Sequence, residues 1–231
     1  MRWALLVPGY VKEWHLGIRV CTSGKLFGFI SAIPVKTQIK DKEVKMAEVN
    51  YLCVHKKLRA KRLAPVLIKE LTRIINTSGT FQAIYTAGIV VPRPATTATY
   101  WHRTLNPKKL VEVGFSSLPA GVPMAKYVKS HNVEKENELN LLGNVRPMEE
   151  KDVKAVTKLL NEYLKRFEVR LKFSEKEIAH MLIPQENLIH SYVVESAETK
   201  QITDMVSFYS LPSTILKKIG HSHDRVNVCA C

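Results

Sequence analysis

The most constraining stretch of the sequence is a short apolar strand that leads directly into a basic loop and then a helix. The segment MAEVNYLCV (46–54) has the β-branched and aromatic composition of a strand. Lysine and arginine then occupy five of the seven positions 56–62. Leucines recur at helical spacing from Leu63 to Leu71, and Pro65 falls in the first turn, where its missing N–H is harmless. Because unpaired first-turn N–H groups and nearby cations both attract anions, this arrangement favours a phosphate-binding site.

The basic run also has blander interpretations: a solvated surface, an RNA-binding patch or a nuclear-localisation signal. The whole chain carries 35 Lys+Arg against 21 Asp+Glu, a net charge of +14, which favours anionic partners in general. Nucleic acid, an acidic membrane surface and a phosphate-bearing cofactor all satisfy this requirement. Charge alone leaves these alternatives open.

Length and composition place the chain among ordinary globular proteins. Its 231 residues are enough for a real core, and 45% of them are hydrophobic. No apolar run approaches the roughly 18 residues of a membrane-spanning helix, so we expect no membrane span. Pro8 and Gly9 interrupt the first apolar run, which therefore does not resemble a signal peptide. The four cysteines form no disulfide framework, which fits a reducing compartment, and we expect a cytoplasmic location.

The remaining pattern predicts two α+β units in succession. Residues 15–33 read as a hairpin and 81–88 as a further strand. After a polar linker the pattern starts afresh, with a helix beyond Pro147. The later elements are a capping box formed by Ser174 and Glu177 ahead of another helix, and then a strand pair, SYVVES and ITDMVSFYS.

Several long motifs in one order resemble the protein N-myristoyltransferase family. The first is EVNYLCVHK (48–56), continued by LRAKRLAPV, and the others are FQAIYTAG, TYWHRTLNPKKL, VRPMEEKDV, PQEN and SFYSLPSTIL. Together they cover about residues 3–216. In related acetyltransferases the loop carries Gln/Arg-x-x-Gly-x-Gly/Ala over the pyrophosphate of coenzyme A. Arg59 and Ala64 fit that frame, while Arg62 stands where the middle glycine would be, as in the myristoyltransferase version.

The resemblance implies an α+β fold with an acetyltransferase-like (GNAT-type) mixed sheet flanked by helices. It implies two pseudo-symmetric halves, both incomplete, so that the chain is truncated at both ends relative to the family. The expected organisation is an acyl-CoA-binding half at 1–130 that lacks its start, a linker at 131–143, the start of a peptide-binding half at 144–216, and a divergent tail at 217–231.

The implied function is transfer of myristate from myristoyl-CoA to the amino-terminal glycine of proteins, by direct attack of the glycine amine on the thioester. In the family the carboxyl-terminal carboxylate deprotonates that amine. The carboxylate of Cys231 ends an unrelated-looking tail, so we expect impaired transfer. Myristoyl-CoA is the expected co-substrate, with no permanently bound cofactor, no nucleic-acid partner and a monomeric state. The alternatives are a non-catalytic fragment that binds acyl-CoA or protein, and nucleic-acid binding through the basic loop.

The resemblance also assigns roles by position. The backbone N–H groups of Tyr51 and Leu52 would form the oxyanion hole, with Asn50 and Thr86 near the glycine amine. The acyl-CoA residues would be Leu52, Val54, Arg59, Ala60, Lys61, Arg62, Leu63 and Ala64, and the peptide-groove residues His102, Phe115, Tyr209 and Ser213. The family usually has Phe at Tyr51 and Ser at Ala60, so one phosphate hydrogen bond is expected to be missing.

Without the resemblance, each of these residues has a simpler structural interpretation. His102 would be an ordinary packed or surface histidine, Phe115 a core residue, and Asn50 a residue that satisfies a bulge. Tyr209 and Ser213 would be strand-end and turn residues. The tail motif His221-x-His223 with Cys229-x-Cys231 has the spacing of no familiar zinc site, so we expect no metal.

Overall fold

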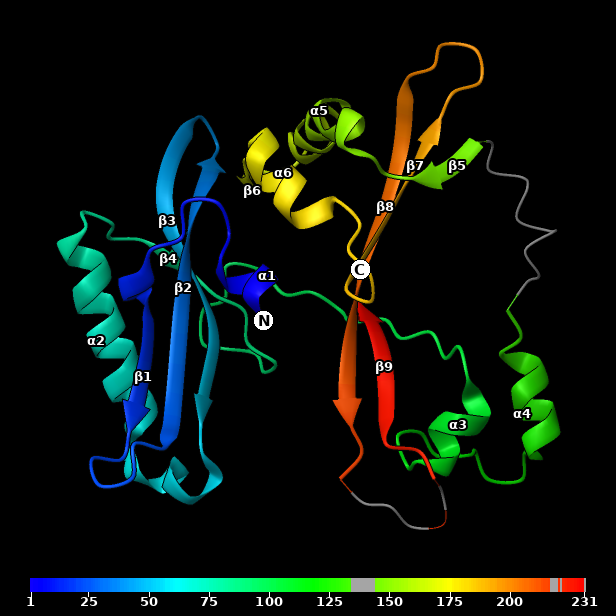
Figure 1. Ribbon diagram of the computed structural model, residues 1–231, viewed down its shortest axis with the longest axis horizontal. Helices are drawn as coiled ribbons and strands as arrows, with labels where there is room; N and C mark the ends of the chain where they lie inside the picture. The colour runs from blue at the N-terminus through cyan, green and yellow to red at the C-terminus, as the bar shows by residue number, and fades with distance from the viewer. Residues whose placement is uncertain (134–143, 217–219, 221, 231) are drawn as a thin grey trace. The chain divides into compact units, whose positions relative to one another are not determined.

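The computed structural model describes residues 1–133, 144–216, 220 and 222–230. It has the predicted α+β fold, with two sheets and flanking helices (Figure 1). The chain divides into two compact units, one made of residues 1–93 and 150–181 and the other of residues 94–149 and 182–231. Residues 150–181, which the sequence assigns to the second half, therefore belong to the first unit. The predicted linker lies mostly outside the described residues, and the predicted domain boundaries and the pseudo-symmetry stay predictions.

The first unit is built on a five-stranded mixed sheet. Its strands are β1 (His15–Arg19), β2 (Leu26–Ile39), β3 (Lys42–Val54), β4 (Ala83–Ile84) and β6 (Val169–Leu171). The order is β1, β2, β3, β4, and β6 also pairs with β2. All pairs are antiparallel except β3 with β4, which is parallel. The predicted hairpin at 15–33, the strand at 46–54 and the mixed sheet are confirmed.

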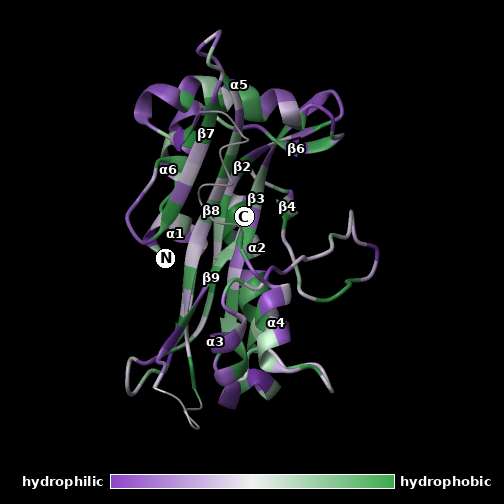
Figure 2. Cartoon of the chain, turned by 90° about the vertical axis from the view of Figure 1, so that its right-hand side faces the viewer, coloured by the Kyte–Doolittle hydropathy of each residue, from purple (hydrophilic) through white to green (hydrophobic). Residues whose placement is uncertain are grey.

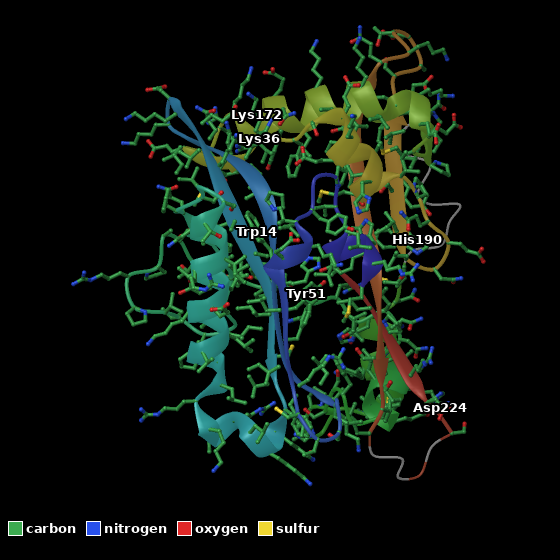
Figure 3. The ribbon with its side chains drawn as sticks, turned by 60° about the vertical axis from the view of Figure 1, so that its left-hand side comes forward. Trp14, Lys36, Tyr51, Lys172, His190 and Asp224 are labelled. Atoms are coloured by element: carbon green, nitrogen blue, oxygen red, sulfur yellow. The ribbon has the colours of Figure 1, made fainter. Side chains whose placement is uncertain are left out.

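Helix α2 (Leu63–Thr77) packs against one face of this sheet (Figure 1). Its residues Leu67, Leu71 and Ile75 share one face because they are four positions apart, and all three are buried. Burying each such side chain stabilises the fold by about 1.5–3 kcal/mol. The buried cluster consists of Trp14, Ile30, Ala32, Ala47, Leu67, Leu71 and Ile75, with Trp14 labelled in Figure 3. The helical periodicity predicted from Leu63 onward thus supplies the core of the first unit.

Six shorter helical elements complete the first unit. They are α1 (Arg2–Leu5), η1 (Lys12–Trp14), η2 (Lys56–Lys61), η4 (Glu150–Asp152), α5 (Val153–Leu164) and α6 (Glu175–Leu182). Helices α5 and α6 carry both hydrophobic and hydrophilic residues, as amphipathic helices do (Figure 2). Two contacts explain why this late segment belongs with the start of the chain. Trp3 Nε1 donates to the carbonyl of His180 at 3.1 Å, and His180 Nε2 lies 2.7 Å from the carbonyl oxygen of Trp3.

The predicted capping box at the start of α6 is confirmed. The Ser174 backbone N–H and hydroxyl both donate to the Glu177 carboxylate, at 2.7 and 2.5 Å. The Glu177 N–H lies 3.4 Å from Ser174 Oγ. These reciprocal bonds satisfy groups at the helix start that the helix itself leaves without partners.

The second unit contains a four-stranded antiparallel sheet in the order β5, β7, β8, β9. Its elements are α3 (Pro107–Glu112), α4 (Met124–Ser130), β5 (Asn144–Pro147), β7 (Ile189–Glu195), β8 (Ile202–Thr214) and β9 (Arg225–Ala230). Ile189, Val193 and Val226 are buried on this sheet. The predicted strand pair corresponds to β7 and β8.

The structure differs from the sequence prediction at two strands. The tail, for which the pattern predicts no element, contains β9, because the long strand β8 offers a free edge along which residues 225–230 pair. The strand predicted at 81–88 shortens to β4, because its pairing with β3 ends at Glu48 and Ile84. Among the described helices, none is both long and apolar enough to cross a membrane.

Candidate functional site

Strand β3 contains a bulge at the residues predicted to form the oxyanion hole. Its partner register runs from Cys53 opposite Phe29 to Asn50 opposite Ser31, so Tyr51 and Leu52 together face one residue of β2. Tyr51 has a φ of 57°, a left-handed conformation that is costly for a residue with a side chain. Tyr51 and Leu52 are each 43% exposed. Such a bulge redirects backbone groups away from the regular ladder, which is the local geometry that an oxyanion hole requires.

The Ser31 hydroxyl fixes the start of this bulge. Ser31 is fully buried, and its Oγ donates to the carbonyl of Asn50 at 3.0 Å. This side-chain hydrogen bond, at the paired position next to the bulge, helps to hold the irregular backbone in one arrangement.

A pocket of about 530 Å³ opens beside the bulge, where β3 and β4 separate. The parallel register places Ala47 opposite Ala83 and Glu48 opposite Ile84, and pairing then stops. Residues on both sides of the separation line the pocket, including Asn50 and Thr86. Its wall also includes α2, through Ile68, Leu71, Thr72, Ile75 and Asn76.

The four predicted catalytic residues meet at this pocket: Asn50, Tyr51, Leu52 and Thr86 all line it. The sequence prediction omitted several other residues of the wall, among them the exposed aromatic side chains of Phe81 and Tyr85. They were missed because aromatic residues in a segment predicted as a strand are expected to be buried. Phe81 precedes the two paired residues of β4 and Tyr85 follows them, so neither residue is paired in the sheet.

A second pocket, of about 220 Å³, shares Asn50 and Tyr51 with the first. Its other walls come from the amino-terminal segment, from β2 and from the segment carrying β6 and α6. Tyr51, labelled in Figure 3, therefore lies at a point of β3 that contributes to both pockets. The sequence did not predict this pocket, because the segments that line it are up to 178 positions apart (Trp3 to Met181).

The basic loop connects β3 to α2 as the short helix η2. His55 caps η2 by accepting a hydrogen bond from the Lys57 N–H at 3.3 Å. Arg59 Nε lies 3.5 Å from the carbonyl of Val54. The side chains of Arg59, Lys61 and Arg62 are exposed. Three exposed cations therefore lie in the loop that precedes the start of α2.

Arg62 occupies a backbone position that suits glycine. Its φ and ψ are 54° and 35°, in the left-handed region, and it is the residue before the first turn of α2. This conformation explains why related loops carry glycine there, since glycine adopts it without steric cost. No side chain caps α2, and its first turn contains no acidic residue. The helix start therefore keeps its partial positive charge for a ligand.

The predicted acyl-CoA residues follow one continuous path. Leu52 lines the larger pocket, Val54 ends β3, and residues 59–64 form the loop and the start of α2. Ala60 is exposed within η2 and offers no hydroxyl to a phosphate.

The four predicted peptide-groove residues all belong to the second unit. His102 is exposed in an irregular segment, and Phe115, which follows α3, is 62% exposed. The simpler interpretation of Phe115 as a core residue is therefore wrong. Tyr209 and Ser213 lie on β8, opposite Ala230 and Val226, so the interpretation of Ser213 as a turn residue is also wrong. Within the described residues, no group of three or more His, Cys, Asp or Glu side chains could hold a metal ion.

Comparisons with known proteins identify the family. The model of the myristoyl-CoA:protein N-myristoyltransferase amino-terminal domain matches residues 1–98, and that of the carboxyl-terminal domain matches residues 112–229. Glycylpeptide N-tetradecanoyltransferase 1 of Arabidopsis thaliana is 51% identical over 216 residues, which is 94% of this chain and 49% of the relative. The Plasmodium falciparum enzyme of that name is 49% identical over 93% of this chain and 51% of its own length. The chain thus spans about half the length of the relatives it matches.

The fold leads to the same family. The structure of Saccharomyces cerevisiae N-myristoyltransferase with bound myristoyl-CoA superposes with a TM-score of 0.90 at 42% identity, covering 99% of this chain and 52% of the other. The fold of this chain is therefore that of the solved N-myristoyltransferase, over about half of that protein's length. The chain belongs to the N-myristoyltransferase family.

Proposed function

We propose that this chain binds myristoyl-CoA and transfers its myristoyl group to the amino-terminal glycine of proteins. The observation that carries the proposal is the meeting of Asn50, Tyr51, Leu52 and Thr86 at one pocket, along the strand that leads into the basic loop. The relatives named glycylpeptide N-tetradecanoyltransferase, and the yeast relative solved with myristoyl-CoA, support the choice of acyl donor and acceptor.

The basic loop would hold the phosphates of coenzyme A. Arg59, Lys61 and Arg62 supply charge-assisted donors, and the uncapped start of α2 adds backbone N–H groups and a partial positive charge. The exposure of these side chains leaves them available to the ligand.

The larger pocket would hold the acyl chain. Its volume of about 530 Å³ is typical of a small-molecule site, and its α2 wall contains the apolar residues Ile68, Leu71 and Ile75. Each methylene that leaves water for such a wall contributes about 0.8 kcal/mol, so a long chain gains more than a short one. The pocket therefore favours a fatty acyl group over an acetyl group.

The bulge would then place the thioester carbonyl. In the reaction the amine nitrogen forms a bond to the carbonyl carbon, the carbon–sulfur bond breaks, and coenzyme A leaves as its thiol. Overall one proton is released from the glycine ammonium. Negative charge develops on the carbonyl oxygen, and backbone N–H groups of Tyr51 and Leu52 would stabilise it.

The remaining assignments rest on the family. Asn50 and Thr86 would contact the amine, and His102, Phe115, Tyr209 and Ser213 would line the groove for the rest of the peptide. We further propose a monomeric protein of the cytoplasm. The free Cys21, Cys53 and Cys229 are consistent with that reducing compartment.

The test is transfer of labelled myristate from myristoyl-CoA to a peptide beginning Gly-x-x-x-Ser, with the full chain and a Gly→Ala peptide as control. Glycine-dependent product supports the proposal. Absence of product from a folded chain that binds myristoyl-CoA would favour the second candidate, a non-catalytic acyl-CoA-binding protein. One observation favours that candidate: every residue proposed for acyl-CoA lies in the first unit, whereas the proposed groove residues lie in the second.

A further inference from the structure

The smaller pocket of the first unit contains a carboxylate with no cationic partner among the residues that the structure describes. Its lining is mostly apolar, with Trp3, Ile33, Val35, Leu171, Phe173 and Met181 among its residues. Two carboxylates also line it, those of Glu48 and Glu177. Glu177 is engaged in the capping box with Ser174. Glu48 forms no ion pair with any residue that the structure describes, and it is half-buried on β3.

The side chain that Glu48 contacts is Asn50. The Asn50 Nδ2 donates to Glu48 Oε1 at 3.1 Å. The two residues are two positions apart on β3, so their side chains emerge on the same face. An ionised carboxylate only accepts hydrogen bonds, and it therefore requires Asn50 to present its NH₂ group rather than its oxygen.

This requirement fixes the direction of the Asn50 amide. Because the amide is planar, Oδ1 lies on the opposite side of its carbon from the bond to Glu48. Asn50 also lines the larger pocket, together with Thr86. Asn50 Oδ1 accepts no hydrogen bond from the residues that the structure describes, and an oxygen kept as an acceptor suits an N–H of an amine and not the carbonyl oxygen of a thioester.

We propose that Glu48 is a positioning residue for the acceptor amine, acting by holding the Asn50 amide with Oδ1 toward the substrate. The inference rests on the proposed function, since it presumes an amine beside Asn50. It deepens that function by giving the glycine amine a selective acceptor. A glycine nitrogen that is methylated or acetylated has fewer N–H donors, so a hydrogen bond to Asn50 Oδ1 stabilises it less.

The experiment is an equilibrium binding measurement, which does not depend on turnover. The full chain is saturated with a non-cleavable thioether analogue of myristoyl-CoA, and the affinities of a Gly-x-x-x-Ser peptide and of its N-acetylated form are compared by calorimetry. The variants are E48M, which removes all polarity in a mostly apolar pocket, and E48Q, which permits either direction of the amide. E43M, on the same strand but outside both pockets, is the control; Glu43 pairs with Lys172 at 2.6 Å, so this change removes an ion pair but nothing that faces the amine.

Wild type and E43M should prefer the free-amine peptide. In E48M the ratio of the affinities for the free-amine and acetylated peptides should fall about tenfold, as expected for the loss of one charge-assisted hydrogen bond. In E48Q the ratio should fall by less. The double variant E48M/N50A should lose no more than N50A, because both changes remove the same oriented oxygen. Analogue binding should be unchanged in E48M, E48Q and E43M, which shows that the first unit is folded.

Three results would overturn the positioning role: an unchanged preference in E48M, equal losses in E48Q and E48M, or additive losses in the double variant. Equal losses would mean that Glu48 acts only through its charge. A wild-type chain that binds the analogue but does not distinguish the two peptides would instead overturn the acceptor half of the proposed function. The two failures are therefore separable.

Discussion

Helices α2 and α6 begin in opposite ways. Helix α6 starts with a capping box, in which Ser174 and Glu177 satisfy each other's backbone and side-chain groups, and its first turn is acidic. Helix α2 starts from Arg62 in a left-handed conformation, with no side-chain cap, no acidic residue in its first turn and a basic loop before it. A helix whose first N–H groups already have partners within the protein needs no anion at its start.

The difference separates a structural helix start from a binding one. Electrostatics favours acidic residues at a helix start, so the cations before α2 work against the helix unless an anion neutralises them. The buried residues Leu67, Leu71 and Ile75 stabilise α2 enough to tolerate that cost. Four predictions follow from this contrast.

The largest effect is expected from reversing the loop charge. The variant R59E/K61E/R62E should weaken binding of myristoyl-CoA on the order of a thousandfold, since three charge-assisted contacts are replaced by repulsion. The measurement is calorimetric titration at fixed salt. The matched control is K36E/K42E/K45E, whose exposed lysines lie at the other end of the sheet and should change affinity little. Equal losses in both variants would mean that net charge, and not the loop, attracts the ligand.

The next effect comes from giving α2 an acidic first turn. Ala64→Asp should weaken myristoyl-CoA binding about tenfold, because the carboxylate competes with the phosphates. The same change should stabilise the unliganded chain by about 0.3–1 kcal/mol through the helix dipole. Binding and urea unfolding of the same variant measure the two effects, and Ala64→Asn is the uncharged control. A variant that is stabilised without losing affinity would contradict a phosphate site at this helix start.

Removing the capping box of α6 should lower the stability of the fold without weakening ligand binding. Ser174→Ala should lower the free energy of unfolding by about 1 kcal/mol, as the loss of a helix cap does. Its affinity for myristoyl-CoA should stay at the wild-type value. Glu175→Ala, in the same turn but outside the box, should cost less stability. A loss of affinity in Ser174→Ala would show that α6 is not purely structural.

The smallest effect concerns an ion pair on the exposed face of α2. The Arg73 guanidinium donates two hydrogen bonds to Glu70, at 3.0 and 2.7 Å, and chiefly this bonding lowers the pKa of Glu70 below its ordinary value of 4.5. A lowered pKa means that the pair stabilises the fold above pH 4.5, and that this contribution is lost as the pH falls through the lowered pKa. Arg73→Ala should return the pKa of Glu70 toward its ordinary value, as measured by NMR titration, while myristoyl-CoA affinity stays unchanged. Reduced affinity in that variant would extend the binding surface beyond the loop.

Much of the fold followed from local sequence patterns. The hairpin, the strand at 46–54, the start of α2 and the Ser174–Glu177 box depend on residues that are near one another in the chain. Strand β9 did not follow, because its formation depends on an edge of β8 and not on its own periodicity. The shortening of β4 likewise depends on where pairing with β3 stops.

The site was predictable only where motifs carried it. Asn50, Tyr51, Leu52 and Thr86 were named from the family resemblance, and the larger pocket contains all four. Glu48 was not named, although it lies within the same motif. Its relation to Asn50 is a side-chain contact within a pocket whose walls come from distant segments, and no spacing rule reveals it.

The most direct test of the central claim is equilibrium binding of three ligands to the full chain: myristoyl-CoA, coenzyme A without the acyl group, and myristate. The account predicts saturable binding of myristoyl-CoA, weaker binding of coenzyme A that disappears in R59E/K61E/R62E, and weakest binding of myristate. Binding of myristoyl-CoA should persist in the presence of an oligonucleotide competitor. No binding of myristoyl-CoA by the folded chain would contradict the account. Full displacement of myristoyl-CoA by the oligonucleotide, at the same concentration of negative charge, would also contradict it and would favour nucleic-acid binding by the basic loop.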